Sequence, residues 1–330
     1  MPELQDSVTS ERTLAMLRTA MGPVIADALD DPKVIEIMVN PDGRLWLDKL
    51  GFGRIDTGKS LTPDEGERAI RLVASHINQD VTAQAPIISA ELPGNGERFE
   101  GVMPPVVTAP CFSIRKGAVV VFTLADYVKA ETMTNKQADA LKYAVTSRQN
   151  ILIVGGTSSG KTTLANALLS EVSGSGDRIL ILEDTRELQC EAEDTVALRT
   201  HGKNVTLADL VRSTLRLRPD RIIVGEVRGP EALDMLKAWN TGHPGGIATV
   251  HANSAKAGLS RIEQLILEGV TVVPRALIAE AIDVIVFISG RGSKRRIDMI
   301  ARLIGVSGEA YELEPLTAPS SIPKLTHEGD

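Results

Sequence analysis

Apolar and polar residues follow two different patterns along the chain. In the first third, apolar residues recur at helical spacing over 11–29, and two segments joined by a Pro-Asp-Gly turn predict a β-hairpin over 34–50. A Thr-Pro-Asp-Glu start predicts a helix over about 62–77, because threonine can cap the helix and proline suits its first position. Residues 81–116 predict short strands interrupted by prolines. These elements indicate an α+β domain.

Beyond residue 120 the pattern changes to continuous apolar runs that alternate with helical segments. Six runs are expected to be strands: 151–155, 178–184, 196–200, 221–226, 247–252 and 284–290. Strands that are apolar throughout and separated by helices indicate a mostly parallel sheet with helices on both faces, an α/β fold.

The two patterns together predict how the chain is divided. A smaller N-terminal α+β domain is expected over 1–119, followed by a linker over 120–132. The α/β domain is expected over 133–308. The last segment, 309–330, holds three prolines and several acids, so we expect a loosely ordered C-terminal tail.

A glycine-rich segment follows the apolar run 151–155 and opens the next helix. Its residues are Gly155, Gly156, Thr157, Ser158, Ser159, Gly160, Lys161, Thr162 and Thr163. This is the P-loop pattern, in which glycines let the backbone curve so that N–H groups and the positive end of the helix dipole face phosphates. We expect all nine residues to bind a nucleoside triphosphate such as ATP. Lys161 is expected at the β- and γ-phosphates and the Thr162 hydroxyl on Mg²⁺.

Acidic residues end two of the other predicted strands. A P-loop enzyme needs a carboxylate at the end of a neighbouring strand, to order Mg²⁺ or to polarise the attacking water. Glu226 supplies one, and we expect it to hold Mg²⁺ directly or through water. Glu183 and Asp184 end the strand that follows the P-loop helix. Either Glu183 or Glu226 can be the base, and the roles of Asp184 and Glu187 stay open.

Histidines and arginines supply candidate contacts to the transferring phosphate. His243 and His251 flank a short predicted strand, and we expect both to return to the same sheet edge and sense the γ-phosphate. A zinc site is disfavoured because no cysteine or acid lies beside them at ligand spacing. A cation also speeds phosphoryl transfer, because it stabilises the charge on the transferring group. Arg98, Arg115 and Arg228 are candidates for this cation, and the sequence pattern alone does not select among them.

Composition and charge disfavour some classes of binding partner. The net charge of −7 and the 3% aromatic content disfavour stable nucleic-acid binding. Two distant cysteines, no signal-peptide pattern and no apolar run of 18 residues predict a cytoplasmic protein whose membrane contact is peripheral. Four cations are expected in a solvated hairpin turn: Arg291, Lys294, Arg295 and Arg296. Their contact with anionic lipid is a further hypothesis.

The four motifs, taken in order, resemble a known family. The segments GGTSSGKTT, ILEDTREL, LRLRPDRIIVGEVRG and NTGHPGGIATVHANS closely resemble the Walker A, Asp box, Walker B and His box of the type II/type IV secretion ATPase superfamily. The sequences of these segments are most similar to those of the conjugal-transfer branch of the superfamily, the TrbB-type ATPases. The resemblance spans about residues 10–305. It implies a RecA-like P-loop domain behind the N-terminal domain, and a hexameric ring with ATP held between the two domains.

The resemblance also implies roles for individual residues. They are Lys161 and Thr162 as the Walker A pair, Glu183 as the Asp-box acid, Glu226 as the Walker B acid, His243 and His251 as the His-box histidines, and Arg98 and Arg115 as arginines that reach the phosphates from the N-terminal domain. The expected function is a homohexameric ATPase that powers assembly or substrate transfer by a conjugative type IV secretion system. Its partners would be other components of that system at the inner membrane. The alternatives are a nucleic-acid-dependent RecA-like motor and a pilus or type II secretion ATPase.

Overall fold

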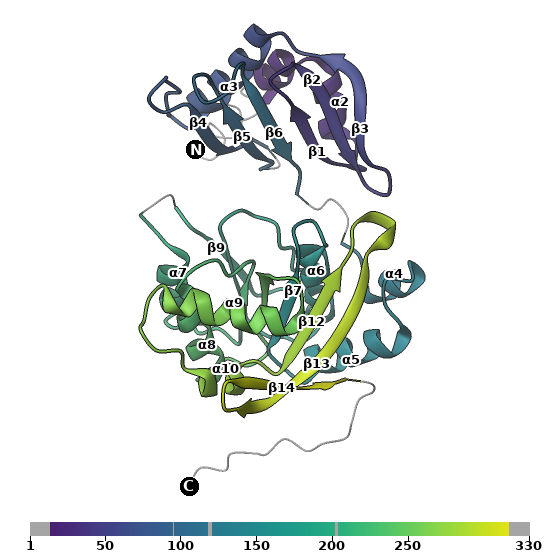
Figure 1. Cartoon of the computed structure of the whole chain (residues 1–330), viewed down its shortest axis with the longest axis vertical. Helices are drawn as coiled ribbons and strands as arrows, with labels where there is room; N and C mark the ends of the chain where they lie inside the picture. Colours follow the sequence, from purple (N-terminus) through teal and green to yellow (C-terminus); the bar gives the residue numbers. More distant parts are fainter. Residues whose placement is uncertain (1–13, 95, 118–120, 202–203, 317–330) are drawn as a thin grey trace. The chain divides into compact units, whose positions relative to one another are not determined.

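The chain forms two compact units, Met1–Val120 and Val121–Asp330. The computed structural model, shown in Figure 1, describes residues 14–94, 96–117, 121–201 and 204–316. In this described part, no helix has both the length and the apolar character needed to cross a bilayer. Each unit has its own sheet and its own core, and each is described by itself below.

The first unit is built on a six-stranded antiparallel sheet in the order β3-β2-β1-β6-β5-β4. Its elements are α2 (Pro23–Asp30), β1 (Val34–Val39), β2 (Arg44–Lys49), β3 (Gly53–Ser60), α3 (Pro63–His76), β4 (Ile87–Glu91), β5 (Arg98–Val102) and β6 (Cys111–Arg115). Alternate residues such as Ile37 and Ile114 are buried in a core with helical residues such as Ile25 and Ile70. One face of the sheet therefore packs on the helices.

Local signals in this unit are confirmed. The predicted hairpin is formed by β1 and β2, which pair antiparallel. The Thr62 hydroxyl accepts a hydrogen bond from the Glu65 N–H, and the Glu65 carboxylate accepts one from the Thr62 N–H, so α3 begins with a capping box. The apolar segment predicted over 11–29 is helical from residue 14 and is interrupted at Gly22, where φ is +83°. Its first residues lie outside the described part.

The second unit is built on an eight-stranded sheet in the order β14-β13-β12-β7-β11-β10-β8-β9. Its strands are β7 (Ile151–Gly155), β8 (Ile179–Glu183), β9 (Thr195–Arg199), β10 (Arg221–Val224), β11 (Ile247–His251), β12 (Val284–Ser289), β13 (Arg296–Ser307) and β14 (Ala310–Pro315). From β12 to β9 neighbouring strands run parallel, whereas β13 and β14 are antiparallel additions at one side. The predicted α/β class is confirmed.

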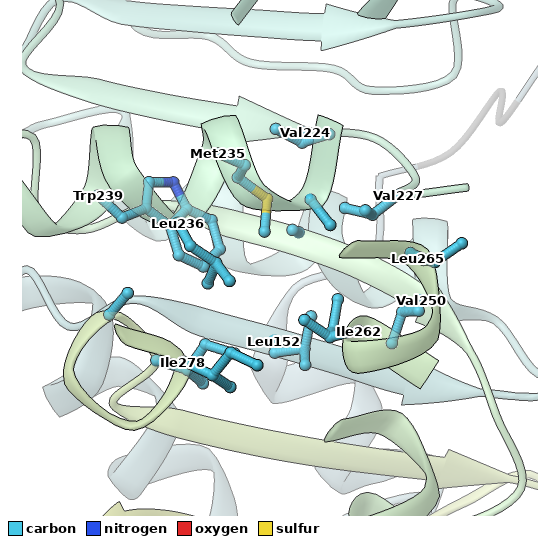
Figure 2. Close-up of a cluster of buried hydrophobic side chains, with 14 of the residues drawn as sticks. Leu152, Val224, Val227, Met235, Leu236, Trp239, Val250, Ile262, Leu265 and Ile278 are labelled. Atoms are coloured by element: carbon cyan, nitrogen blue, oxygen red, sulfur yellow. The ribbon is translucent and has the colours of Figure 1, made fainter. Parts of the chain in front are cut away.

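Helices cover both faces of this sheet (Figure 1). They are α4 (Leu124–Lys129), α5 (Asn135–Thr146), α6 (Lys161–Val172), α7 (Leu207–Thr214), α8 (Glu231–Asn240), α9 (Ala255–Leu267) and α10 (Arg275–Ala281). Successive residues of β7 point to opposite faces, so Ile151 and Ile153 join the core under α4, α5 and α6. Leu152 joins the core under α7 to α10, where it lies with Trp239 and Ile262 in Figure 2.

Two expectations about the ends of this unit differ from the structure. The segment expected as a linker contains α4, because Thr123 and Asp126 form a capping box and Tyr127 is buried in the core. The segment expected as a loose tail contains β14, which pairs with β13. Tyr311 and Leu313 alternate with exposed residues and pack on the core, a period-two signal that the nearby prolines obscured. The rest of that predicted tail, 317–330, lies outside the described residues.

Candidate nucleotide-binding site

Sheet topology brings residues from all four predicted motifs to one edge of the second unit. Strands β7, β8, β10 and β11 are parallel, so their carboxyl ends meet at the same edge. Gly155 at the end of β7 is the register partner of His251 at the end of β11. Glu183 ends β8, and Glu226 follows the end of the adjacent strand β10. The P-loop, two candidate acids and one candidate histidine therefore occupy neighbouring positions.

The P-loop needs glycine at two positions for different reasons. A Cβ on Gly155 would lie 2.5 Å from Ser159 Oγ and 2.6 Å from the Ile288 carbonyl oxygen. Gly160 has a φ of +97° and caps α6 in the left-handed region, which side chains disfavour. The first N–H groups of α6 have no partner within the helix, so the loop and the helix present donors suited to an anion.

Lys161, His251 and Glu226 form one polar network beside the P-loop. Lys161 is 7% exposed, and its Nζ donates to the Gly156 carbonyl at 3.2 Å. The same Nζ lies 3.2 Å from the ring nitrogens of His251. His251 Nε2 in turn lies 2.9 Å from Glu226 Oε1. A residue from each of three predicted motifs therefore reaches one place at the sheet edge.

Cationic neighbours keep the carboxyl of Glu226 ionised. Burial raises its pKa, but the hydrogen bond from Arg228 and the charges of Arg228, His251 and Lys161 outweigh this effect and lower it. Arg228 Nη2 donates to Glu226 Oε2 at 2.7 Å, and Arg228 Nη1 lies 3.6 Å from Asp184. Arg228 is thus part of the site, although the sequence offered only its position two residues after Glu226 as a signal.

Glu183 has a different environment. It is 4% exposed, and its Oε1 accepts hydrogen bonds from the backbone N–H groups of Glu187 at 3.0 Å and Leu188 at 2.7 Å. Burial raises the pKa of this carboxyl to about 7, even though both hydrogen bonds act in the opposite direction. A Cβ on Gly225 would lie 3.0 Å from Glu183 Cγ, so the glycine before Glu226 makes room for this side chain. Glu183 holds the loop that follows β8.

Glu187, whose role the sequence left open, lies beside the predicted metal ligand. The Thr162 hydroxyl donates to Glu187 Oε2 at 3.2 Å. Asn166, on the P-loop helix, donates to the Glu187 carbonyl at 3.2 Å and accepts from the Gln189 N–H at 2.9 Å. Asn166 therefore fixes this loop on α6. The signal for Glu187 was its place four residues after Glu183, whereas nothing in the sequence marked Asn166.

Oxygen ligands are the ones that Mg²⁺ prefers, and this edge offers them. Among the residues that the structure describes, no group of three or more histidines, cysteines and acids could hold a metal ion alone. Mg²⁺ in nucleotide enzymes commonly uses one or two protein oxygens together with phosphates and water. The Thr162 hydroxyl and the carboxylates of Glu187 and Glu226 fit that requirement.

His243 lies at the other end of its strand. The expectation that both histidines reach the same sheet edge is wrong for this residue, because β11 runs between His243 and His251. Five residues of strand span roughly 16 Å. His243 Nδ1 lies 2.9 Å from the Pro219 carbonyl oxygen, next to the start of β10. This contact therefore lies at the edge of the sheet where β10 and β11 begin, and not at the edge that carries the P-loop.

Arg98 and Arg115 belong to the first unit. They are register partners on the adjacent strands β5 and β6, so their side chains leave the same face of that sheet. Glu91 is the partner of Arg98 on β4, and Glu36 is the partner of Arg115 on β1. These four residues form one row across the sheet. Their positions alternate with the buried positions of the strands, so the row lies on the face opposite the core. Contact of these arginines with a nucleotide stays a prediction, as does phosphate binding by Thr157, Ser158 and Thr163.

A parallel sheet with a P-loop and strand-end carboxylates defines a P-loop nucleoside triphosphatase. The family model described as Type II/IV secretion system protein matches residues 62–289. The chain belongs to this family, and the resemblance of its four motifs is confirmed.

Individual relatives agree with the family. The chain is 47% identical over 305 residues to the conjugal transfer protein TrbB of Rhizobium radiobacter. The matched residues cover 92% of this chain and 94% of that protein. It is 34% identical over 304 residues to the type IV secretion system protein PtlH of Bordetella pertussis, covering 80% and 88% respectively. The X-ray structure of the ATPase DotB of Legionella pneumophila matches with a TM-score of 0.61 at 21% identity, covering 85% of this chain and 80% of that chain. At that identity the structural likeness shows the fold alone.

Proposed function

We propose that this chain hydrolyses ATP to power assembly or substrate transfer by a conjugative type IV secretion system. The observation that carries the proposal is the Lys161–His251–Glu226 network at the P-loop edge of the sheet. The names of the relatives, a conjugal transfer protein and a type IV secretion protein, support the setting. The net charge of −7 disfavours a nucleic-acid motor.

In the proposed reaction the backbone N–H groups of residues 155–163 hold the α- and β-phosphates, and Lys161 neutralises the β- and γ-phosphates. His251 donates a hydrogen bond to the γ-phosphate. The attacking water passes a proton to the Glu226 carboxylate and forms a bond to the γ-phosphorus as the bond to the bridging oxygen breaks, which yields ADP and phosphate. Mg²⁺, held through Thr162 with Glu187 or Glu226, would neutralise charge on the phosphates.

We assign the water-orienting role to Glu226 and not to Glu183. The Glu226 carboxylate is ionised and within the network that contains Lys161 and His251. Glu183 has a pKa better matched to a general base, but its Oε1 already accepts two backbone N–H groups and it is 4% exposed. Position comes before pKa in choosing a base, because the base must reach the proton that it removes.

We further propose that the RecA-like second unit works in a homohexamer, peripheral to the inner membrane, with Arg98 and Arg115 acting on the phosphates. The support for the two arginines is that they are register partners on adjacent strands, which places both side chains on one face of the first sheet. Light scattering after size exclusion, with and without ATP and Mg²⁺, tests the hexamer. A monomer under both conditions would contradict it.

The hydrolysis proposal is tested by the release of phosphate from ATP with the wild-type chain and Lys161→Ala. Loss of the buried ammonium should reduce the rate about 100-fold or more. Lys136→Ala, at an exposed position of α5, is the matched control and should keep the wild-type rate. Unchanged hydrolysis by Lys161→Ala would overturn the site assignment.

A further inference from the structure

One cation of the hairpin between β12 and β13 lies against the P-loop. Arg291, Lys294 and Arg296 are exposed, as expected for a solvated turn, but Arg295 is partly buried, so the expectation was wrong for this residue. A Cβ on Gly160 would lie 2.8 Å from both Nε and Cζ of Arg295. The guanidinium of Arg295 therefore lies on the backbone of the last glycine of the P-loop.

The hairpin holds Arg295 in this position. Gly290 has a φ of +75°, and a Cβ there would collide with the Lys294 carbonyl, so the turn is tight. Two residues after Arg295, the Ile297 N–H donates to the Thr132 carbonyl at 2.8 Å. The Gln137 side chain donates to the Ile297 carbonyl at 3.1 Å, and Ile297 itself is buried in the core. The base of the hairpin is thus fixed on the segment around α4 and α5.

The order of the strands indicates which end of a nucleotide Arg295 would meet. Strands β11 and β10 lie on one side of β7, and they carry His251 and Glu226, the residues proposed for the γ-phosphate. Strands β12 and β13, with Arg295 between them, lie on the other side of β7. A nucleotide that runs along the P-loop with its γ-phosphate toward β11 has its α-phosphate and nucleoside toward β12 and β13.

Arg295 also has a donor that lacks a protein acceptor. Its Nε is buried and has no hydrogen-bond partner within the described part of the chain. A buried donor of a charged group is costly when it has no partner, and a phosphate oxygen is a strong acceptor for a guanidinium. The charge of Arg295 also acts on the buried Tyr127 hydroxyl, whose pKa is raised by burial and lowered by Arg295. Among the ion pairs of the described residues none includes Arg295, whereas its neighbour Arg296 is paired with Asp298.

We propose that Arg295 is a nucleotide-binding residue outside the four motifs, which donates to the α-phosphate of the bound nucleotide from the same chain. The inference rests on the proposed function, because it needs a nucleoside triphosphate in the P-loop. Contact with the α-phosphate is the same for ATP and ADP, before and after hydrolysis. Arg295 therefore contributes to uniform binding, in contrast to His251 and Glu226.

The experiment compares nucleotide affinities of the full chain, measured by calorimetry with Mg²⁺, for ADP, UDP and a non-hydrolysable ATP analogue. Loss of a charge-assisted hydrogen bond should weaken binding of all three about tenfold or more in Arg295→Ala, with partial recovery in Arg295→Lys. Arg291→Ala, from the same hairpin, is the control and should bind as the wild type does. In steady state, Arg295→Ala should raise KM and leave kcat within about twofold.

Several results would overturn the inference. Wild-type affinity in Arg295→Ala would exclude the contact, and an equal loss in Arg291→Ala would assign the effect to the overall charge of the hairpin. A loss seen with ADP but not with UDP would place Arg295 on the base instead of the α-phosphate. A lower melting temperature of the nucleotide-free Arg295→Ala chain, with no rescue by lysine, would assign it a structural role. If the wild-type chain bound no nucleotide, the proposed function would fail instead.

Discussion

Glu183→Gln gives a pH-dependent stability that can be worked out from the structure. Burial raises the pKa of Glu183 from 4.5 to about 7 in the folded chain. Between these values the folded state binds more protons than the unfolded state, so the free energy of unfolding falls as pH rises through this range. The difference corresponds to about 3 kcal/mol. Glutamine keeps an oxygen that accepts the N–H groups of Glu187 and Leu188 but does not ionise, so the variant should lack this loss.

The assay follows unfolding of the second unit alone. The chain has two tryptophans, and Trp239 is 2% exposed in the core of the second unit. In a Trp46→Phe background, Trp239 fluorescence during urea unfolding therefore reports on the unit that contains Glu183. Stability is measured from pH 5 to pH 8 with and without Glu183→Gln. Glu193→Gln, at an exposed position, is the matched control for the loss of one carboxyl.

The expected result is that the stability of Glu183→Gln relative to its parent increases by about 2–3 kcal/mol between pH 5 and pH 8. The control should run parallel to the parent. Parallel curves for Glu183→Gln and its parent would show that Glu183 does not have a raised pKa. Burial would then not outweigh the two backbone hydrogen bonds that Glu183 accepts.

Three further substitutions test other parts of the structure. Asp177→Ala leaves Arg221 buried without the partner that its Nε contacts at 2.6 Å, so the free energy of unfolding should fall by about 3–5 kcal/mol; a urea titration that gives less than ~1 kcal/mol refutes this. Gly155→Ala places a Cβ 2.6 Å from the Ile288 carbonyl and should cost about 1–3 kcal/mol and weaken ATP binding; an unchanged melting temperature would contradict it. His251→Ala should lower kcat roughly 10- to 100-fold with ADP affinity unchanged; a wild-type kcat would remove it from the γ-phosphate.

The local features of the fold were predictable from the sequence. Continuous apolar runs indicated buried parallel strands, and the P-loop spacing placed Gly160 and Lys161 at the start of α6. Glu183 and Glu226 were expected at strand ends for the same reason, since parallel strands expose their carboxyl ends at one edge. These predictions depend on short stretches of chain, where spacing and chemistry are enough.

The contacts that define the site were less predictable, because they depend on the order of strands in the sheet. The sequence places β8 directly after the P-loop helix, but β11 and β10 lie between β7 and β8. His251 therefore reaches Lys161, whereas the strand itself separates His243 from the site. Arg295 was expected in solvent with its neighbours, since nothing in a run of cations shows which one turns toward Gly160.

The two acids of the site illustrate the same limit. Both Glu183 and Glu226 end apolar strands, and the sequence offered no reason to prefer one as the base. The structure separates their environments, with two backbone N–H groups on Glu183 and a lysine, a histidine and an arginine around Glu226. Their pKa values shift in opposite directions as a result.

We propose that Glu226, within the Lys161–His251 network, orients the water that attacks ATP. The most direct measurement is single-turnover hydrolysis of ATP by Glu226→Gln, with ATP binding measured in the same samples and Glu183→Gln as the comparison. We predict that Glu226→Gln binds ATP as the wild type does but releases phosphate at least about 100-fold more slowly, while Glu183→Gln stays within about tenfold of the wild type. Wild-type hydrolysis by Glu226→Gln, or a greater loss in Glu183→Gln, would contradict it.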